Sequence, residues 1–91
     1  MYRVRDQLKF KYGMSLEDYE RMSAQQDGRC AICGSLESHG KTQHFVVDHD
    51  HTTGEIRALL CNRCNPALGL MGDDPERLEA AARYLRAFKR E

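Results

Sequence analysis

The chain has 91 residues, of which 41% are hydrophobic and 31% are charged, and its 14 lysines and arginines balance 14 aspartates and glutamates. A domain of this size buries a limited share of its surface, so we expect a staple in addition to a hydrophobic core. The apolar runs are far too short to cross a membrane, and the first residues have no apolar stretch typical of a secretory signal. These features exclude a membrane protein, a collagen-like fibre and a disordered tail.

The N-terminal part of the chain predicts two helices. Residues 2–12 are expected to form a first, basic helix that is broken at Gly13. Ser15 followed three residues later by Asp18 is a variant of the capping box, and it predicts a second helix that runs to about Gln26. The apolar residues of the second helix recur with the helical period and should face the core: Leu16, Tyr19 and Met22.

Two Cys-x-x-Cys pairs come next, Cys30 with Cys33 and Cys61 with Cys64. Two such turns, each carrying two thiolates, make up the ligand set of a closed tetrahedral zinc site. A disulfide framework needs an oxidising compartment and a dithiol redox protein needs a single pair, so zinc fits the duplicated pattern best. Structural zinc contributes on the order of 10 kcal/mol in small domains and would be the expected staple.

The stretch between the two pairs predicts a loop followed by a β-hairpin. Residues 35–44 form the loop, residues 45–47 and 56–60 have the composition of strands, and residues 50–54 are rich in turn formers. The hairpin carries a run of acids and histidines: Asp48, His49, Asp50 and His51. A solvated polar turn explains one such residue better than four in a row, because neighbouring acids repel each other without a cation. The run therefore indicates a functional site.

Beyond the second pair, Asn65 and Pro66 open a short helix that nearby glycines limit. Because zinc would hold Cys64, Asn65 would lie at the N-terminus of this helix, where free N–H groups attract phosphate. The amide oxygen of Asn65 and the carboxylate of Asp48 are hard oxygen donors of the kind that Mg²⁺ prefers. An ordinary helix cap is the alternative role for Asn65.

The sequence Asp74-Pro75-Glu76 predicts the start of a last helix that reaches the C-terminus. Basic residues gather at its end, between residues 83 and 90, as they do in residues 1–12. The helix has an apolar stripe made of Leu78, Ala81, Ala82, Leu85 and Phe88. Such a stripe completes a core or joins two chains, and the core is the simpler interpretation.

The run VDHDHxTGEIR over residues 47–57, followed by LLCNxCNxALG over residues 59–69, resembles the phage recombination endonuclease VII family. This family belongs to the wider HNH, or ββα-metal, nucleases. The resemblance implies a small α+β zinc-stabilised domain with a treble-clef-like ββα-metal core and flanking N- and C-terminal helices. One domain would then span residues 1–91, with a helical lead-in over 1–27, a zinc-held core over 28–72 and a C-terminal helix over 73–91.

The resemblance also implies roles for individual residues. Asp48 and Asn65 would ligate a catalytic Mg²⁺ or Mn²⁺, and His49 would be the general base. His51 matches a second histidine of the family, with a role at the phosphate or in orienting the site. Arg57 and Arg63 flank the site in the sequence. Each could hold the phosphate backbone or pair with a surface acid.

These roles imply a metal-dependent DNA endonuclease that hydrolyses phosphodiester bonds, leaving a 5′-phosphate and a 3′-hydroxyl. A branched-DNA (Holliday junction) resolvase is the alternative within the nucleases. A non-catalytic zinc-binding adaptor is the alternative outside them, with His49 and His51 on a second zinc. DNA would be the partner, a homodimer through the terminal helices is one arrangement, and the compartment would be the cytoplasm of a bacterial host or phage-infected cell.

Overall fold

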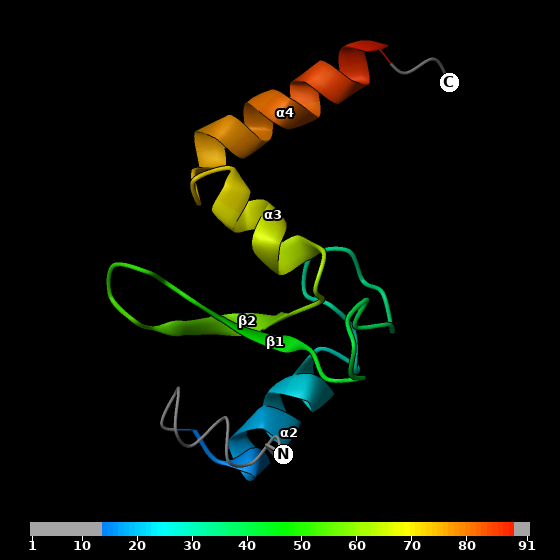
Figure 1. Ribbon diagram of the computed structural model, residues 1–91, viewed down its shortest axis with the longest axis vertical. Helices are drawn as coiled ribbons and strands as arrows, with labels where there is room; N and C mark the ends of the chain where they lie inside the picture. The colour runs from blue at the N-terminus through cyan, green and yellow to red at the C-terminus, as the bar shows by residue number, and fades with distance from the viewer. Residues whose placement is uncertain (1–13, 89–91) are drawn as a thin grey trace.

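The computed structural model describes residues 14–88, which form a small α+β fold around a two-stranded sheet (Figure 1). Its elements, in chain order, are α2 (Leu16–Gln25), β1 (Val46–His49), β2 (Ile56–Leu60), α3 (Cys64–Leu70) and α4 (Pro75–Phe88). The helix predicted over residues 2–12 lies outside the described residues. In the described part of the chain, the helices are too short or too polar to span a bilayer.

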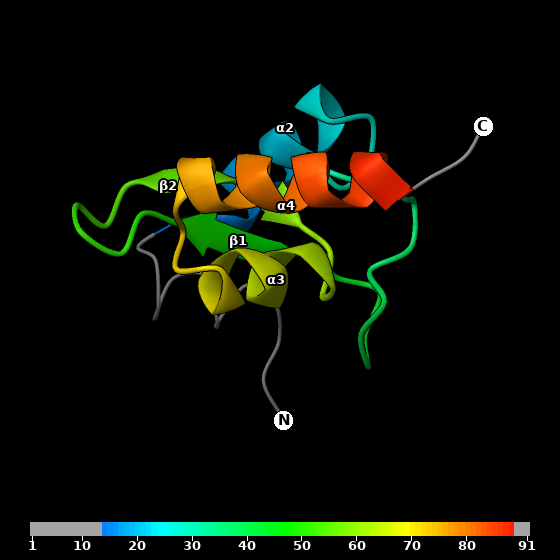
Figure 2. The same cartoon turned by 90° about the horizontal axis from the view of Figure 1, so that it is seen from above.

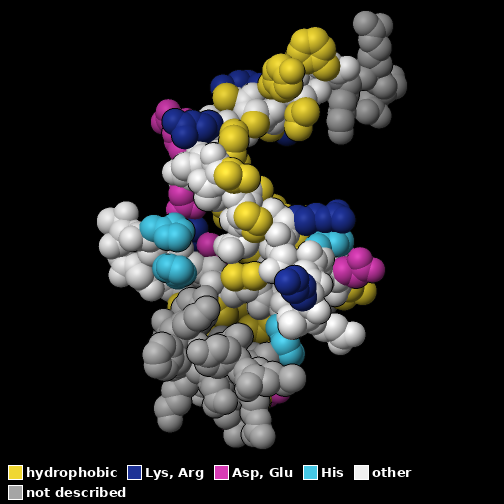
Figure 3. All heavy atoms as spheres, viewed as in Figure 1, with side chains coloured by type: hydrophobic (Ala, Val, Ile, Leu, Met, Phe, Trp, Pro, Cys, Tyr) yellow, Lys and Arg dark blue, Asp and Glu magenta, His cyan; other side chains and the backbone are white. Residues whose placement is uncertain are grey.

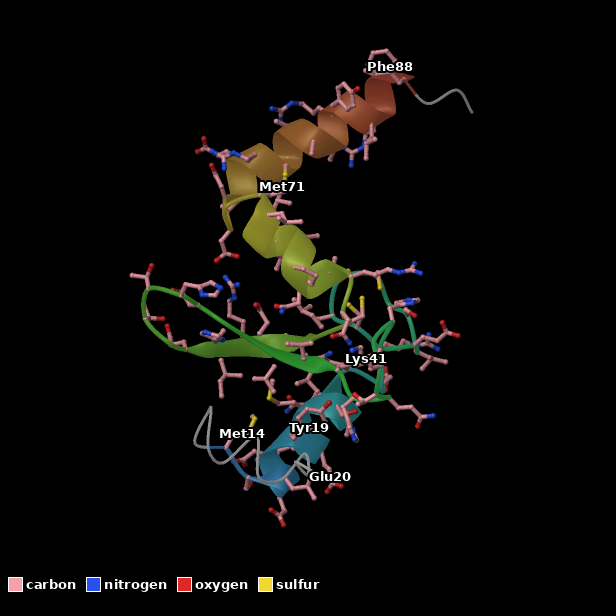
Figure 4. The ribbon with its side chains drawn as sticks, viewed as in Figure 1. Met14, Tyr19, Glu20, Lys41, Met71 and Phe88 are labelled. Atoms are coloured by element: carbon pink, nitrogen blue, oxygen red, sulfur yellow. The ribbon has the colours of Figure 1, made fainter. Side chains whose placement is uncertain are left out.

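Helix α2 confirms the predicted capping box. The Ser15 hydroxyl accepts a hydrogen bond from the Asp18 N–H at 3.0 Å, and the Asp18 carboxylate accepts one from the Ser15 N–H at 3.4 Å. The predicted apolar stripe packs against a buried cluster of Met14, Val47 and Leu59. Tyr19 points from α2 toward the hairpin and donates its hydroxyl hydrogen to the Phe45 carbonyl at 2.9 Å (Figure 4). Helix α2 therefore covers one face of the sheet.

The predicted hairpin is confirmed, with one irregularity in its register. The strands are antiparallel, and Asp48 pairs with Ala58 while the next residue, His49, pairs with Ile56. One step along β1 thus corresponds to two steps along β2, so Arg57 is an extra residue in the ladder, as in a β-bulge. The bulge resets the alternation of side chains. Ile56 can therefore join the apolar cluster under α2, and Arg57 projects toward Asp48.

Gln26, just past the end of α2, closes the outer edge of β2. Its side-chain oxygen accepts a hydrogen bond from the Leu59 N–H at 3.0 Å, and its amide nitrogen donates to the Leu59 carbonyl at 3.0 Å. The same nitrogen donates to the Arg29 carbonyl at 2.7 Å. A side-chain amide thus takes the place of a third strand, which satisfies polar groups that a sheet edge would leave unpaired.

Helix α3 lies on the face of the sheet opposite α2 (Figure 2). Its residue Leu68 packs against a second buried cluster, which consists of Cys30, Leu60 and Cys61. The helix begins at Cys64, one residue before the predicted start. The chain leaves it through Gly72, whose φ of 72° is a left-handed conformation that glycine adopts without strain.

The predicted start of α4 at Pro75 is confirmed, but its apolar stripe does not complete the core. No residue of α4 that the structure describes is buried: Leu78, Ala81 and Ala82 are half-buried, and Leu85 and Phe88 are 56% and 74% exposed. The helix leads away from the hairpin, with Phe88 at its outer end (Figures 1 and 4). Helices α2 and α3 already cover the two faces of the sheet, so α4 has no sheet face to pack on.

The edge closure by Gln26 is testable. We expect Gln26→Ala to destabilise the fold by about 1–3 kcal/mol, because it leaves the Leu59 N–H without its acceptor in a half-buried place. Urea denaturation of the zinc-loaded protein measures the change. Gln25→Ala, at an exposed position of the same helix end, is the matched control and should change stability little. Equal stabilities of the two variants would contradict this role for Gln26.

Candidate metal centre and active site

The four cysteines meet where the turn over residues 30–34, called the first knuckle, approaches the end of β2 and the start of α3. Their sulfur atoms all lie within 4.8 Å of one another. The Sγ atoms of Cys33 and Cys61 are 3.8 Å apart. A tetrahedron with Zn–S bonds of about 2.3 Å has edges of about 3.8 Å, so the spacing fits a Zn²⁺ ion. The predicted cysteine cluster is therefore confirmed, and its chemistry is that of a structural zinc site.

One backbone hydrogen bond ties the first knuckle to β2, and two others close the knuckle itself. The Ala31 N–H donates to the Leu59 carbonyl at 3.2 Å, the Cys30 N–H donates to the Ser35 carbonyl at 2.9 Å, and the Gly34 N–H donates to the Cys30 carbonyl at 3.0 Å. Gly34 has a φ of 75°, the left-handed conformation in which the knuckle ends. The knuckle thus has a closed backbone of its own and is attached to β2 at Ala31.

The thiols of the cluster differ in acidity. Burial works to raise the pKa of Cys30, but hydrogen bonds from the backbone N–H groups of Cys61, Cys33 and Ile32 lower it to about 6. Burial, followed by the neighbouring thiols, raises the pKa of Cys64 to about 12. Because a metal binds thiolates, zinc binding must release protons from this cluster, and acid competes with it.

Next to the cluster, the face of the hairpin under α3 carries an ionic chain. Asp48 is buried, and its carboxylate accepts two hydrogen bonds from Arg57, at 2.7 Å from Nε to Oδ2 and 3.2 Å from Nη2 to Oδ1. The other edge of the guanidinium binds Asp73, at 3.0 Å from Nη1 to Oδ2 and 3.0 Å from Nη2 to Oδ1. Asp48 and then Asp73 raise the pKa of Arg57, which stays charged. Figure 3 shows acidic, basic and histidine side chains gathered where the hairpin faces α3.

Asp73 is a residue beside the candidate site that sequence reasoning missed. The segment from Gly72 to Pro75 indicated only a helix start, whereas Asp73 reaches back to the hairpin. Arg57 lowers the pKa of Asp73. Asp73 has a φ of 56° and donates its N–H to the Leu68 carbonyl at 2.8 Å, which closes the end of α3. Asp73 shares this left-handed conformation with Asp27 and His39 among the described residues, and only the structure shows it.

The two histidines of the hairpin lie together at the end of β1. The ring centroids of His49 and His51 are 4.8 Å apart, with His49 half-buried and His51 exposed. Asp50, between them, turns into the loop and accepts hydrogen bonds from the Thr52 and Thr53 N–H groups at 2.7 and 3.0 Å. These donors, Thr53 first, lower the pKa of Asp50. Of the four residues in the run, Asp50 thus stabilises the loop, while Asp48, His49 and His51 belong to the candidate site.

The remaining predicted residues lie at the start of α3. Asn65 is half-buried, one residue after Cys64, and donates its backbone N–H to the Cys61 carbonyl at 3.1 Å. Arg63 is exposed and occupies the N-cap position of the helix. The structure thus joins Arg57 to Asp48 directly, and it ties both ends of α3 to the hairpin, through the cysteines at one end and Asp73 at the other.

The zinc site predicts a sharp difference between neighbouring positions of the first knuckle. We expect Cys33→Ser to lose the metal and the folded state, because zinc supplies on the order of 10 kcal/mol in such domains. Ile32→Ser, which places the same side chain at a 57% exposed neighbour, should keep one zinc per chain. Elemental analysis and circular dichroism measure both effects. A folded, zinc-free Cys33→Ser protein would contradict this role for the metal.

Comparison with known proteins identifies the family. The sequence pattern of the family described as recombination endonuclease VII matches residues 5–87. The gene 59 protein of Mycobacterium phage D29 is 45% identical over 76 residues, which cover 82% of this chain and 45% of the relative. The gene 59 protein of Mycobacterium phage L5 is 41% identical over 75 residues, which cover 81% and 44%.

The chain spans less than half the length of these two relatives. No solved structure gives a significant match. The family pattern nevertheless extends over the cysteine cluster, the hairpin and most of α4. The chain belongs to the recombination endonuclease VII family.

Proposed function

We propose that this chain is a metal-dependent DNA endonuclease of the HNH, or ββα-metal, type that hydrolyses phosphodiester bonds. The observation that carries the proposal is the position of Asp48 and His49. They end a strand that is joined to both ends of α3, and α3 starts at a cysteine of the zinc cluster. Family membership supports the same reaction. The proposed site combines a carboxylate, an imidazole and the first residues of a helix on one rigid unit.

Asp48 and Asn65 are the proposed ligands of the catalytic cation. A carboxylate oxygen and an amide oxygen suit Mg²⁺ or Mn²⁺, and Mg²⁺ with few protein ligands keeps several waters. The Arg57 fork takes one lone pair of each Asp48 oxygen, and each oxygen has a second lone pair that a cation can use. When bound, the cation would neutralise the charge that develops on the phosphate and the leaving 3′ oxygen.

His49 is the proposed general base. Its neutral imidazole would take a proton from a water in line with the phosphorus and the leaving oxygen. His51, with its ring 4.8 Å from that of His49, would contact the phosphate or orient the base. The exposed Arg63 at the start of α3 is a second proposed phosphate contact. Arg57 is already paired with two carboxylates, so a backbone contact by Arg57 would need those ion pairs to rearrange.

The formal net charge of the chain is zero, so affinity for DNA must come from local basic side chains and the bound cation. Because the family is one of recombination endonucleases, branched DNA is a second candidate substrate. The adaptor alternative needs a second tight zinc. Among residues 14–88, the one group of three or more His, Cys, Asp or Glu side chains close enough to share a metal is the cysteine cluster, and His49 and His51 are not part of it.

The proposed base is tested by His49→Ala. We expect the rate of cleavage of supercoiled plasmid and of a four-way junction, with Mg²⁺ or Mn²⁺, to fall by about 10²–10⁴-fold, because that is what a general base contributes. His44→Ala, at an exposed position before the hairpin, is the matched control and should cleave normally. Zinc content is measured for each protein, so that a misfolded variant is recognised.

Two results would contradict the proposal in different ways. Normal cleavage by a zinc-loaded His49→Ala protein would remove His49 as the base while leaving the nuclease in place. A zinc-loaded wild type that leaves both substrates intact with every cation would contradict the nuclease itself. Together with two tightly bound zinc ions per chain, that second result would favour the adaptor.

A further inference from the structure

Asp73 is joined to the proposed cation ligand through a single guanidinium. Arg57 lies between two carboxylates, with each edge of its planar fork on one of them. Its side chain is 35% exposed, that of Asp73 is 28% exposed, and that of Asp48 is 7% exposed. Bidentate bonds on both edges hold the guanidinium in one plane and at one position, because rotation would break at least one pair.

We propose that Asp73 is a positioning residue, which acts through Arg57 to orient the Asp48 carboxylate and to keep it available to a divalent cation. This inference rests on the proposed function, since Asp48 is there the cation ligand. Asp73 itself contacts neither the cation nor DNA in this arrangement. Its role is to hold the far edge of Arg57.

The balance of charge supports this role. Arg57 alone would neutralise Asp48 and oppose the approach of a cation. The carboxylate of Asp73, bound to the same guanidinium, leaves the three side chains with a net negative charge. Removing the Asp73 charge would therefore weaken cation binding at Asp48 without touching that residue. Direct hydrogen-bond partners of metal ligands typically change metal affinity or activity by about 10–100-fold, and Asp73, one contact further out, should act at the low end of that range.

The backbone conformation at Asp73 also supports a role for its side chain. A φ of 56° is one that asparagine or glycine adopts more readily than most residues. The Asp73 N–H closes α3 by donating to the Leu68 carbonyl, a bond that any non-proline residue can make. The end of the helix therefore requires the conformation but not the carboxylate. What the carboxylate adds is the pair of hydrogen bonds with Arg57.

The test compares Asp73→Asn with Asp74→Asn in the zinc-loaded protein. Each variant removes one carboxylate charge, and the two positions are adjacent in the chain. Asparagine keeps the left-handed backbone at residue 73, and at residue 74 it keeps an acceptor for the Glu76 N–H, which Asp74 now binds at 3.0 Å. Calorimetric titration with Mn²⁺ alone measures the affinity without DNA, and thermal denaturation measures stability.

We expect Asp73→Asn to bind Mn²⁺ about tenfold more weakly than the wild type, with a matching rise in the Mn²⁺ concentration for half-maximal plasmid cleavage. Saturating Mn²⁺ should restore most of the cleavage rate, because Arg57 still holds Asp48 directly. Asp74→Asn should bind Mn²⁺ like the wild type. Asp73→Gly, which suits the left-handed backbone at residue 73, should stay folded and show the same loss of affinity.

Unchanged Mn²⁺ affinity in both residue-73 variants would overturn the inference while the proposed cleavage stands. An equal loss in Asp74→Asn would also overturn it, because the effect would then be one of general charge. Weakened binding in both residue-73 variants, beside a wild type that binds Mn²⁺ but cleaves no DNA, would support the inference and contradict the proposed reaction. A wild type that binds no Mn²⁺ would overturn both.

Discussion

The cysteine cluster is the constraint on which the rest of this structure depends. It joins two segments that the whole hairpin separates in the chain: the first knuckle, and the turn that leads from the end of β2 into the start of α3. The buried apolar residues form two small clusters rather than one large core, and two of the cysteines belong to the second. A core of this size cannot stabilise a domain alone, so a metal-ligand set within it has a direct physical reason.

The two faces of the hairpin differ in chemistry: one is apolar and the other is charged. The face under α2 is apolar and is closed at its edge by the side-chain amide of Gln26. The face under α3 carries a buried carboxylate whose charge is balanced by Arg57. The bulge at Arg57 makes this division possible, because a regular ladder would give Ile56 and Arg57 the opposite faces. The bulge of one residue thus places the Arg57 guanidinium beside Asp48 and keeps Ile56 on the apolar face.

The exposed position of α4 shows the limit of amphipathic patterning as a guide to burial. Its stripe has the helical period, but both faces of the two-stranded sheet are already covered by α2 and α3. The connection to α4 still matters for the site, because it contains Asp73. The homodimer predicted through the terminal helices stays a prediction, as does the division into a lead-in, a core and a C-terminal helix.

The sequence by itself determined the local elements and the metal ligands of this protein. The capping box at Ser15, the hairpin, the start of α4 and the four cysteines were all predictable, because each depends on residues close together in the chain or on a spacing specific to zinc. The acidic and histidine run indicated a functional site, and this stays a prediction. Its further roles as ligand and base remain proposals.

Only the tertiary structure decided the contacts between these elements. The pairing of Gln26 with Leu59, the bulge at Arg57 and the reach of Asp73 to Arg57 all join residues that are far apart in the sequence or depend on strand register. A local pattern carries no information on which partner such a side chain meets, because hydrogen-bond and ion-pair geometry is set by the packing of whole elements. That packing also left the outer part of the α4 stripe, at Leu85 and Phe88, exposed.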